Sequence, residues 1–281
     1  MIGIIDANAI VGFLERWAPL VAYLAIIPWL IALYRLLSTR VNIDGVKQLE
    51  LGFGIAGQTV ALDGVAIALN NSMIVSDLRV SLRKDADKSD HRLDWLMSRQ
   101  HLYKGTTTAG FGMEASMEVA RPFPVPAESV VKFNILFSAT DWAQQAAAIC
   151  QRVTAEWLKY TQQNPGVPLT TVSGGPPTVP GPAFQQFSGT PIFQQARGDL
   201  QKLVDYWVIG SYRITLEARA YGSRLVTRKT WSFAVDSTQI QALQSNVQPL
   251  LQGACNQLPP NWIWGYAYPK LTSISKEAAT R

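Results

Sequence analysis

The feature that most constrains this chain is a long uncharged segment near its amino terminus. Trp17 to Tyr34, WAPLVAYLAIIPWLIALY, runs for 18 residues without a charged side chain. As an α-helix rising about 1.5 Å per residue, it would be about 27 Å long, close to the apolar thickness of a bilayer. The two leucines after Arg35 lengthen it if the arginine extends its charge to the membrane surface. We therefore expect one transmembrane helix at about 17–37.

Several residues of this segment suit the membrane interface. Trp17, Trp29 and Tyr34 are amphipathic aromatics, and Arg35 follows them, so we expect these four residues to anchor the span. A buried core helix and a cleaved signal peptide are the alternatives. The first residues lack a basic region and no small-x-small cleavage site follows, which favours a retained anchor within an amino-terminal segment 1–40.

The basic residues around the span predict its orientation. Arg16 and the α-amine precede it, whereas Arg35, Arg40 and Lys47 follow it. With one span, we expect a single-pass membrane protein. Because the more basic flank of a span stays in the cytoplasm, we expect its large domain to be cytoplasmic rather than periplasmic or extracellular.

Three glycines raise the question of nucleotide binding. Gly52, Gly54 and Gly57 have the spacing G-x-G-x-x-G, which in a dinucleotide-binding protein follows a buried strand and opens a helix. Here charges interrupt the preceding run, and the following residues alternate between apolar and polar, as in a strand. We interpret the match as chance and expect the glycines to mark a strand bend with close backbone approach. A phase slip at Asp63-Gly64 indicates a β-bulge.

The rest of the first half predicts a β-sandwich. Short segments with apolar residues at every second position are separated by turn residues, which is typical of antiparallel strands. The alternating apolar residues are Val60, Leu62, Ile74, Leu78, Val80, Leu82, Met113, Met117, Val131, Phe133 and Ile135. The segment from Lys84 to Gly112 is polar and is expected to be irregular. We expect residues 41–163 to form a β-sandwich part that ends in a helix, and about residues 47–138 of it resemble an immunoglobulin-like sandwich in architecture.

Two helices accompany the strands. Asp141 with Gln144, and Asp236 with Gln239, have capping-box spacing ahead of apolar stripes. Between them, 164–196 is rich in Pro and Gly and uncharged to Ala196, which predicts an extended loop. Residues 197–256 are expected to hold a second β-hairpin and helix. The fold class is therefore mainly β: a membrane-anchored sandwich with two accessory helices.

Candidate catalytic and metal-binding residues are few. His91 and His101 are the only histidines, and His91 could act in acid–base chemistry with Asp90 or Asp94. No nucleophile motif accompanies them, so we do not expect an enzyme. Asp85, Asp87 and Ser89 imitate the start of a calcium loop, but Asp90 occupies the position that requires glycine. No cofactor or metal is predicted.

The composition limits other functions. The net charge of +5 is too small to indicate nucleic-acid binding by itself. Such binding would need clustered Lys and Arg. Cys150 and Cys255 fit no zinc or redox spacing and are either buried thiols or, in an oxidising compartment, a disulfide.

The segment 257–281 contains the most unusual pattern. Trp262, Trp264, Tyr266 and Tyr268 all occupy even positions in PPNWIWGYAYPK. On an extended chain they would lie on one face, suited to contact a partner, a membrane surface or a ligand. A strand that completes the core is the alternative.

Together these features favour a non-catalytic accessory or scaffold subunit of a membrane complex. Its expected partners are other subunits of that complex, the lipid bilayer and further copies of itself, contacted through the β domain, the Pro-rich loop and the aromatic tail. The alternative is a membrane-tethered module that binds a sugar, a lipid headgroup or a nucleic acid on the aromatic face.

Overall fold

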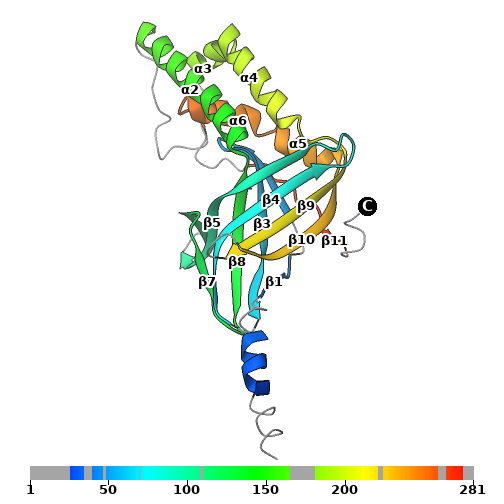
Figure 1. Ribbon diagram of the computed structural model, residues 1–281. Coiled ribbons are helices and arrows are strands. Elements are labelled where there is room, and N and C mark those ends of the chain that lie inside the picture. Colours follow the sequence, from blue (N-terminus) through cyan, green and yellow to red (C-terminus); the bar gives the residue numbers. More distant parts are fainter. Residues whose placement is uncertain are drawn as a thin grey trace, which may run out of the picture.

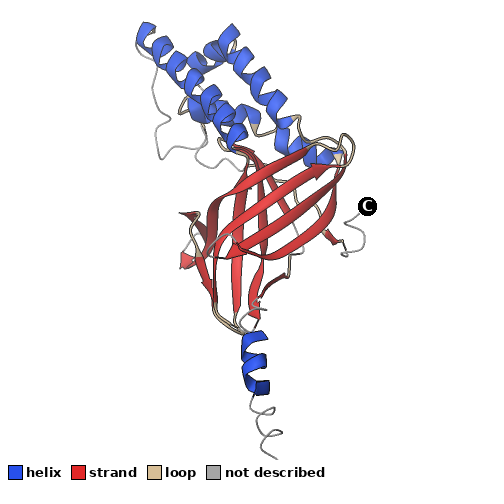
Figure 2. Ribbon diagram, in the orientation of Figure 1, coloured by secondary structure: helices blue, strands red, loops and turns tan. Residues whose placement is uncertain are grey.

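The chain folds into a mainly β structure with most of its described helices gathered at one end and the helical residues 26–34 at the other (Figures 1 and 2). A computed structural model describes residues 26–34, 40–46, 49–69, 71–107, 110–164, 181–220, 224–258 and 264–274. Its strands are β1 (Arg40–Asp44), β2 (Leu49–Gly54), β3 (Gly57–Leu69), β4 (Met73–Lys84), β5 (Asp90–Thr107), β6 (Gly110–Val119), β7 (Phe123–Val125), β8 (Val130–Ser138), β9 (Gly210–Ala220), β10 (Arg224–Val235) and β11 (Thr272–Ser273).

The strands form an open, curled antiparallel sheet. Their order is β1-β3-β8-β5-β4-β9-β10-β11, with β2 beside β3, β6 beside β5 and β7 beside β4. Alternation fills the inner face, as β9 shows: Tyr212, Ile214 and Leu216 are buried, whereas the intervening Arg213 and Glu217 are partly exposed. The predicted strand alternation is confirmed for this hairpin.

The structure does not show the two facing sheets of an immunoglobulin-like sandwich. β4 pairs with β5 along one edge and with β9 along the other, so the hairpin β9–β10 extends the first sheet. Among the described strands, curling of this sheet encloses the core that a second sheet would otherwise cover. Sequence periodicity predicts which residues are buried but not which strands pair, and this explains the difference.

The expected irregular segment from Lys84 to Gly112 is wrong for most of its length. β5 occupies Asp90–Thr107 and pairs with β4, β6 and β8. Leu93 is buried, but its neighbours Arg92 and Asp94 are exposed. Pairing with three strands stabilises this polar strand, and no local signal reports such pairing.

The expected bulge at Asp63-Gly64 is also wrong. β3 and β8 pair without a break from Thr59 to Ile67. A Cβ atom on Gly64 would lie 2.9 Å from the Phe133 ring, so this glycine makes room for close packing.

The helices are α2 (Thr140–Gln163), α3 (Pro182–Ser188), α4 (Pro191–Val204), α5 (Ser237–Gln244) and α6 (Val247–Ala254). The predicted loop 164–196 is therefore wrong where α3 and α4 form; its residues 165–180 lie outside the described part. Proline begins both helices, where its missing N–H costs nothing. Buried Phe184, Phe187 and Phe193 hold them against α2 and each other.

The capping predictions had opposite outcomes. Asp236 and Gln239 form the expected capping box at α5. Asp141 instead lies in the first turn of α2, whose N-cap is Ala139 with no side-chain cap. The sequence predicts one continuous helix with a single apolar face after Asp236. The structure breaks this helix into α5 and α6, and Asn246, which lies at the break, is buried.

Most of the predicted membrane span lies outside the described residues, including Trp17 and Arg35. Residues 26–34 are helical and leave the Trp29 and Tyr34 side chains exposed, Trp29 by 79%. In the described part of the chain, no helix is both long and apolar enough to cross a bilayer.

Candidate functional site

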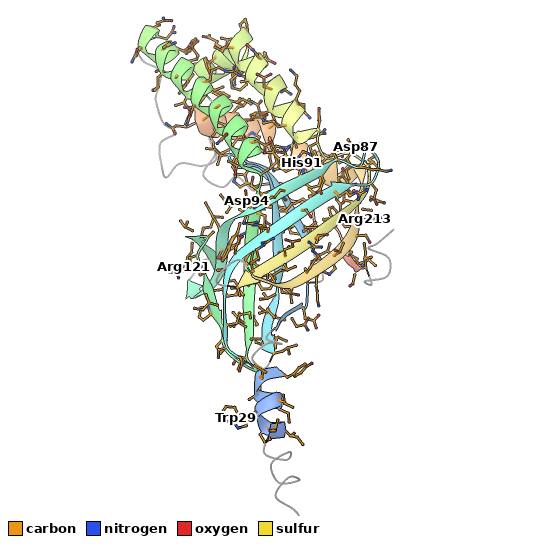
Figure 3. The ribbon with its side chains drawn as sticks, in the orientation of Figure 1. Trp29, Asp87, His91, Asp94, Arg121 and Arg213 are labelled. Atoms are coloured by element: carbon orange, nitrogen blue, oxygen red, sulfur yellow. The ribbon has the colours of Figure 1, made fainter. Side chains whose placement is uncertain are left out.

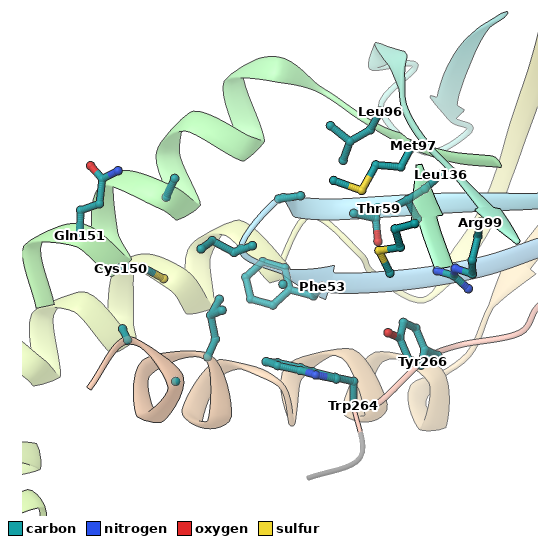
Figure 4. Close-up of a pocket in the computed structure, with 18 of the residues that line it drawn as sticks. Phe53, Thr59, Leu96, Met97, Arg99, Leu136, Cys150, Gln151, Trp264 and Tyr266 are labelled. Atoms are coloured by element: carbon teal, nitrogen blue, oxygen red, sulfur yellow. The ribbon is translucent and has the colours of Figure 1, made fainter. Parts of the chain in front are cut away.

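An apolar groove lies where the sheet, the helices and the carboxyl-terminal tail meet (Figure 4). Its volume is about 540 Å³, within the usual range for small-molecule sites. The residues that define it come from the β2–β3 turn, β5, β6, β8, α2, α6 and the tail. They include Phe53, Thr59, Leu96, Met97, Arg99, Met117, Leu136, Ala147, Cys150, Gln151, Leu250, Gly253, Ala254, Trp264 and Tyr266.

Small residues on the helices keep the groove open. Ala147 of α2 and Gly253 and Ala254 of α6 present little side chain to it. Met97 and Met117 line the sheet side, and methionine adapts readily to the shape of a neighbour.

The three glycines of the G-x-G-x-x-G match lie at the β2–β3 hairpin beside this groove. Gly54 pairs with Gly57 across a two-residue turn, and the chain continues as β3 rather than as a helix. Gly57 has a φ of +67°, and a Cβ atom there would lie 2.8 Å from the Trp142 carbonyl carbon. The predicted close backbone approach is confirmed.

The aromatic tail forms a wall of the groove. Ala267 and Leu51 exchange backbone hydrogen bonds of 3.0 and 2.8 Å, so the tail runs antiparallel to β2. Trp264 and Tyr266 both line the groove. The Tyr268 ring is exposed with its centroid 6.4 Å from that of Tyr266. Trp262 lies outside the described residues.

A buried amide holds this wall in place. The Asn246 side chain, 0% exposed, donates to the carbonyl oxygens of Phe53 at 3.2 Å and Gly265 at 2.7 Å. It also accepts a 2.7 Å hydrogen bond from the Gly265 N–H. A Cβ atom on Gly265 would lie 2.1 Å from the Ala242 carbonyl oxygen, so only glycine fits.

One end of the groove is charged. Arg99 Nη1 lies 2.9 and 3.0 Å from the two Glu50 carboxylate oxygens, with side-chain exposures of 11% and 18%. Arg99 Nε is buried and has no hydrogen-bond partner. Burial and the nearby Glu50 charge raise the pKa of Tyr266 and of Tyr268 above the ordinary phenol value.

The two cysteines are free thiols in the structure. Cys150 lines the groove, and burial raises its pKa to about 11. Burial and the neighbouring Cys150 raise the pKa of Cys255 to about 12. Both thiols are therefore protonated at neutral pH and poorly nucleophilic.

Among the described residues, His91 forms no hydrogen bond or ion pair with Asp90 or Asp94, its two expected acid–base partners. Its ring packs against Trp142 and Tyr206, with centroid distances of 4.9 and 5.0 Å, and these two rings also contact each other. Asp94 instead pairs with Arg92 at 3.4 Å. Figure 3 shows Asp94 farther along β5 than His91.

The residues that imitate a calcium loop are engaged with other groups. Asp85 pairs with Arg213 at 3.2 Å and Asp87 with Lys84 at 3.4 Å. Hydrogen bonds from Ser89 lower the pKa of Asp87 to about 2. Within the described residues, no three His, Cys, Asp or Glu side chains gather into a metal-binding group.

Sequence reasoning missed Arg99 and Met97 because it treated β5 as irregular. Apolar and polar residues alternate around the buried Leu93, which indicates a strand, but the charged residues beside it made this pattern hard to recognise.

Comparisons with known proteins add little to this description of the groove. No family model and no curated protein matches the chain. Among solved structures, Spo0M, a sporulation control protein from Bacillus subtilis, is 10% identical with a TM-score of 0.23. The match covers 76% of this chain and 56% of that chain. A likeness this low has no bearing on fold or function.

Replacing Asn246 by Ala should release the tail. The change removes three hydrogen bonds and leaves buried backbone groups unpaired, so we expect a loss of about 2–4 kcal/mol in the free energy of unfolding. Chemical denaturation in one mild detergent measures it. Asn164→Ala, at an exposed helix end, is the matched control and should cost less than about 1 kcal/mol. Equal losses in the two variants would contradict the role of Asn246.

Proposed function

We propose that the protein is a non-catalytic binding module held at a membrane, and that its groove takes an apolar ligand. The observation that carries the proposal is the wall formed by Trp264 and Tyr266 over a space bounded by the sheet and two helices. The groove leaves the apolar side chains that line it in contact with water, so an apolar ligand that covers them is favoured.

The character of the lining supports an apolar ligand. Leu96, Leu136 and Leu250 line it together with the two methionines, and the charged pair lies at one end. Small-molecule sites commonly combine an apolar body with a few polar groups that fix orientation. Of the ligands considered for the aromatic face, this lining favours lipid over sugar or nucleic acid.

Filling the groove should weaken binding. Ala147→Phe places a ring in the space, so we expect affinity for 1-dodecanol to fall at least about tenfold, roughly 1.4 kcal/mol. The measurement is displacement of the neutral dye N-phenyl-1-naphthylamine from the full chain in nanodiscs, with empty nanodiscs subtracted.

The control is Ala148→Phe, one residue along α2 on its exposed side. It should leave the affinity within about twofold, well under 1 kcal/mol. Equal behaviour of the two variants would count against the groove as the binding site.

Two observations support attachment to a membrane. The 18 uncharged residues from Trp17 to Tyr34 include the helical 26–34, whose described side chains are all exposed. Figure 1 places this helix at the end of the sheet opposite to α2–α6. The same end carries exposed Leu69, Ile74 and Val130, an apolar rim that suits contact with lipid.

Charges within the span should detach the protein. Ile27→Asp combined with Leu30→Asp introduces two carboxylates, each costing about 2.5–3.5 kcal/mol at the centre of a span. We expect the variant to leave the membrane fraction on alkaline washing. The control is the double variant Leu158→Asp/Ile209→Asp, which changes exposed positions outside the predicted span. This protein should remain in the membrane fraction. Retention of the first variant in the membrane fraction would contradict the anchor hypothesis.

The second candidate function is an accessory or scaffold subunit of a larger membrane complex. The exposed Tyr266 and Tyr268 rings favour it, since tyrosine is enriched in protein interfaces. Tyr268 is absent from the groove lining, so its exposure is unexplained by ligand binding.

Native mass after mild extraction tests the subunit hypothesis. We expect the wild-type chain in a stoichiometric assembly from which Tyr268→Ala dissociates, because aromatic interface residues often contribute about 2 kcal/mol or more. Leu158→Ala, at another exposed position, should stay assembled. A wild-type chain recovered bare would argue against a stable complex.

A further inference from the structure

We infer that the ligand of the groove is a long-chain carboxylate, with its head at Arg99 and its chain directed toward α2 and α6. This inference rests on the proposed function and adds the chemical class and orientation of the ligand. It follows from the hydrogen bonding of Arg99 and from the distribution of polar groups along the groove.

Arg99 has unused donor capacity in a nearly buried position. Its Nη1 serves both oxygens of Glu50, but its buried Nε has no partner. Buried donors on charged groups are normally satisfied, because losing water without gaining an acceptor is unfavourable. An acceptor oxygen from a ligand at this end of the groove would satisfy the guanidinium after a small shift of its side chain.

The part of the groove away from Arg99 is suited to an alkyl chain, because Gln151 there is exposed to solvent and the Thr154 hydroxyl is already bonded to backbone carbonyls. Figure 4 shows Arg99 and Tyr266 at one end and Cys150 and Gln151 at the other. The space between them is lined by Met97, Leu250 and other apolar groups. A ligand with one polar head and one long apolar chain therefore matches the groove along its length.

The head chemistry is set by the Arg99–Glu50 pair. A planar carboxylate matches the donors of a guanidinium and carries a single negative charge. Arg99 lines the groove and Glu50 does not, so a head group in the groove meets the guanidinium first, which attracts an anion and repels a cation. An alcohol of equal chain length lacks the charge and is the natural comparison.

The test compares dodecanoate with 1-dodecanol by dye displacement from the full chain in nanodiscs, at a pH at which the carboxylate is ionised. We expect wild type to prefer dodecanoate by about tenfold or more. Arg99→Gln should remove the preference, whereas Arg92→Gln, on the exposed side of β5, should keep it. Glu50→Gln should increase it, because the competing carboxylate is gone.

The double variant Glu50→Gln/Arg99→Gln guards against misfolding, since it leaves no unpaired charge. Loss of preference in this variant, with 1-dodecanol still bound, supports the inference. Equal wild-type binding of the two ligands, or a preference that survives loss of Arg99, overturns the assignment of the head. In that case sensitivity of both ligands to Ala147→Phe would still support the proposed function, and insensitivity of both would reject that too.

Discussion

The buried side chain of Asn246 is the contact on which the site depends. It joins the end of β2, the break between α5 and α6, and the tail at Gly265 through three hydrogen bonds. These segments are far apart in the chain, and backbone groups buried between them need partners. The amide supplies those partners and so fixes the tail, with Trp264 and Tyr266, against the sheet. Without this link the groove would lose a wall.

The groove persists because the surrounding packing is strong. Buried aromatic rings hold α2, α3 and α4 together, and Gly57 brings the hairpin against the start of α2. Small residues at Ala147 and Gly253 then leave space that the neighbouring elements do not fill. Apolar side chains that face water in such a groove are better stabilised when a ligand covers them, which is why we interpret it as a site. Arg99 and Glu50 give that space a polar end.

Local patterns in the sequence predicted part of this structure. Alternation identified the inner face of β9, and the Asp236 capping box was confirmed. Of the four tail aromatics expected on one face, Trp264 and Tyr266 line the groove and Tyr268 does not. Pairing between distant segments was not predictable: β5 looked irregular because its partners lie elsewhere, and the two-sheet sandwich is replaced by one curled sheet. The groove itself combines residues from seven segments, so no local motif announces it. Trp17, Arg35 and Trp262 lie outside the described residues, and their predicted roles stay predictions.

A crystal structure of the full chain grown with 12-bromododecanoate would test the central claim most directly. Bromine scatters anomalously and marks the far end of the alkyl chain. The account predicts one bromine site between α2 and α6, near Cys150, with the carboxylate at Arg99. An empty groove, with bromine only at the apolar rim near Leu69 and Val130 or elsewhere on the surface, would contradict it.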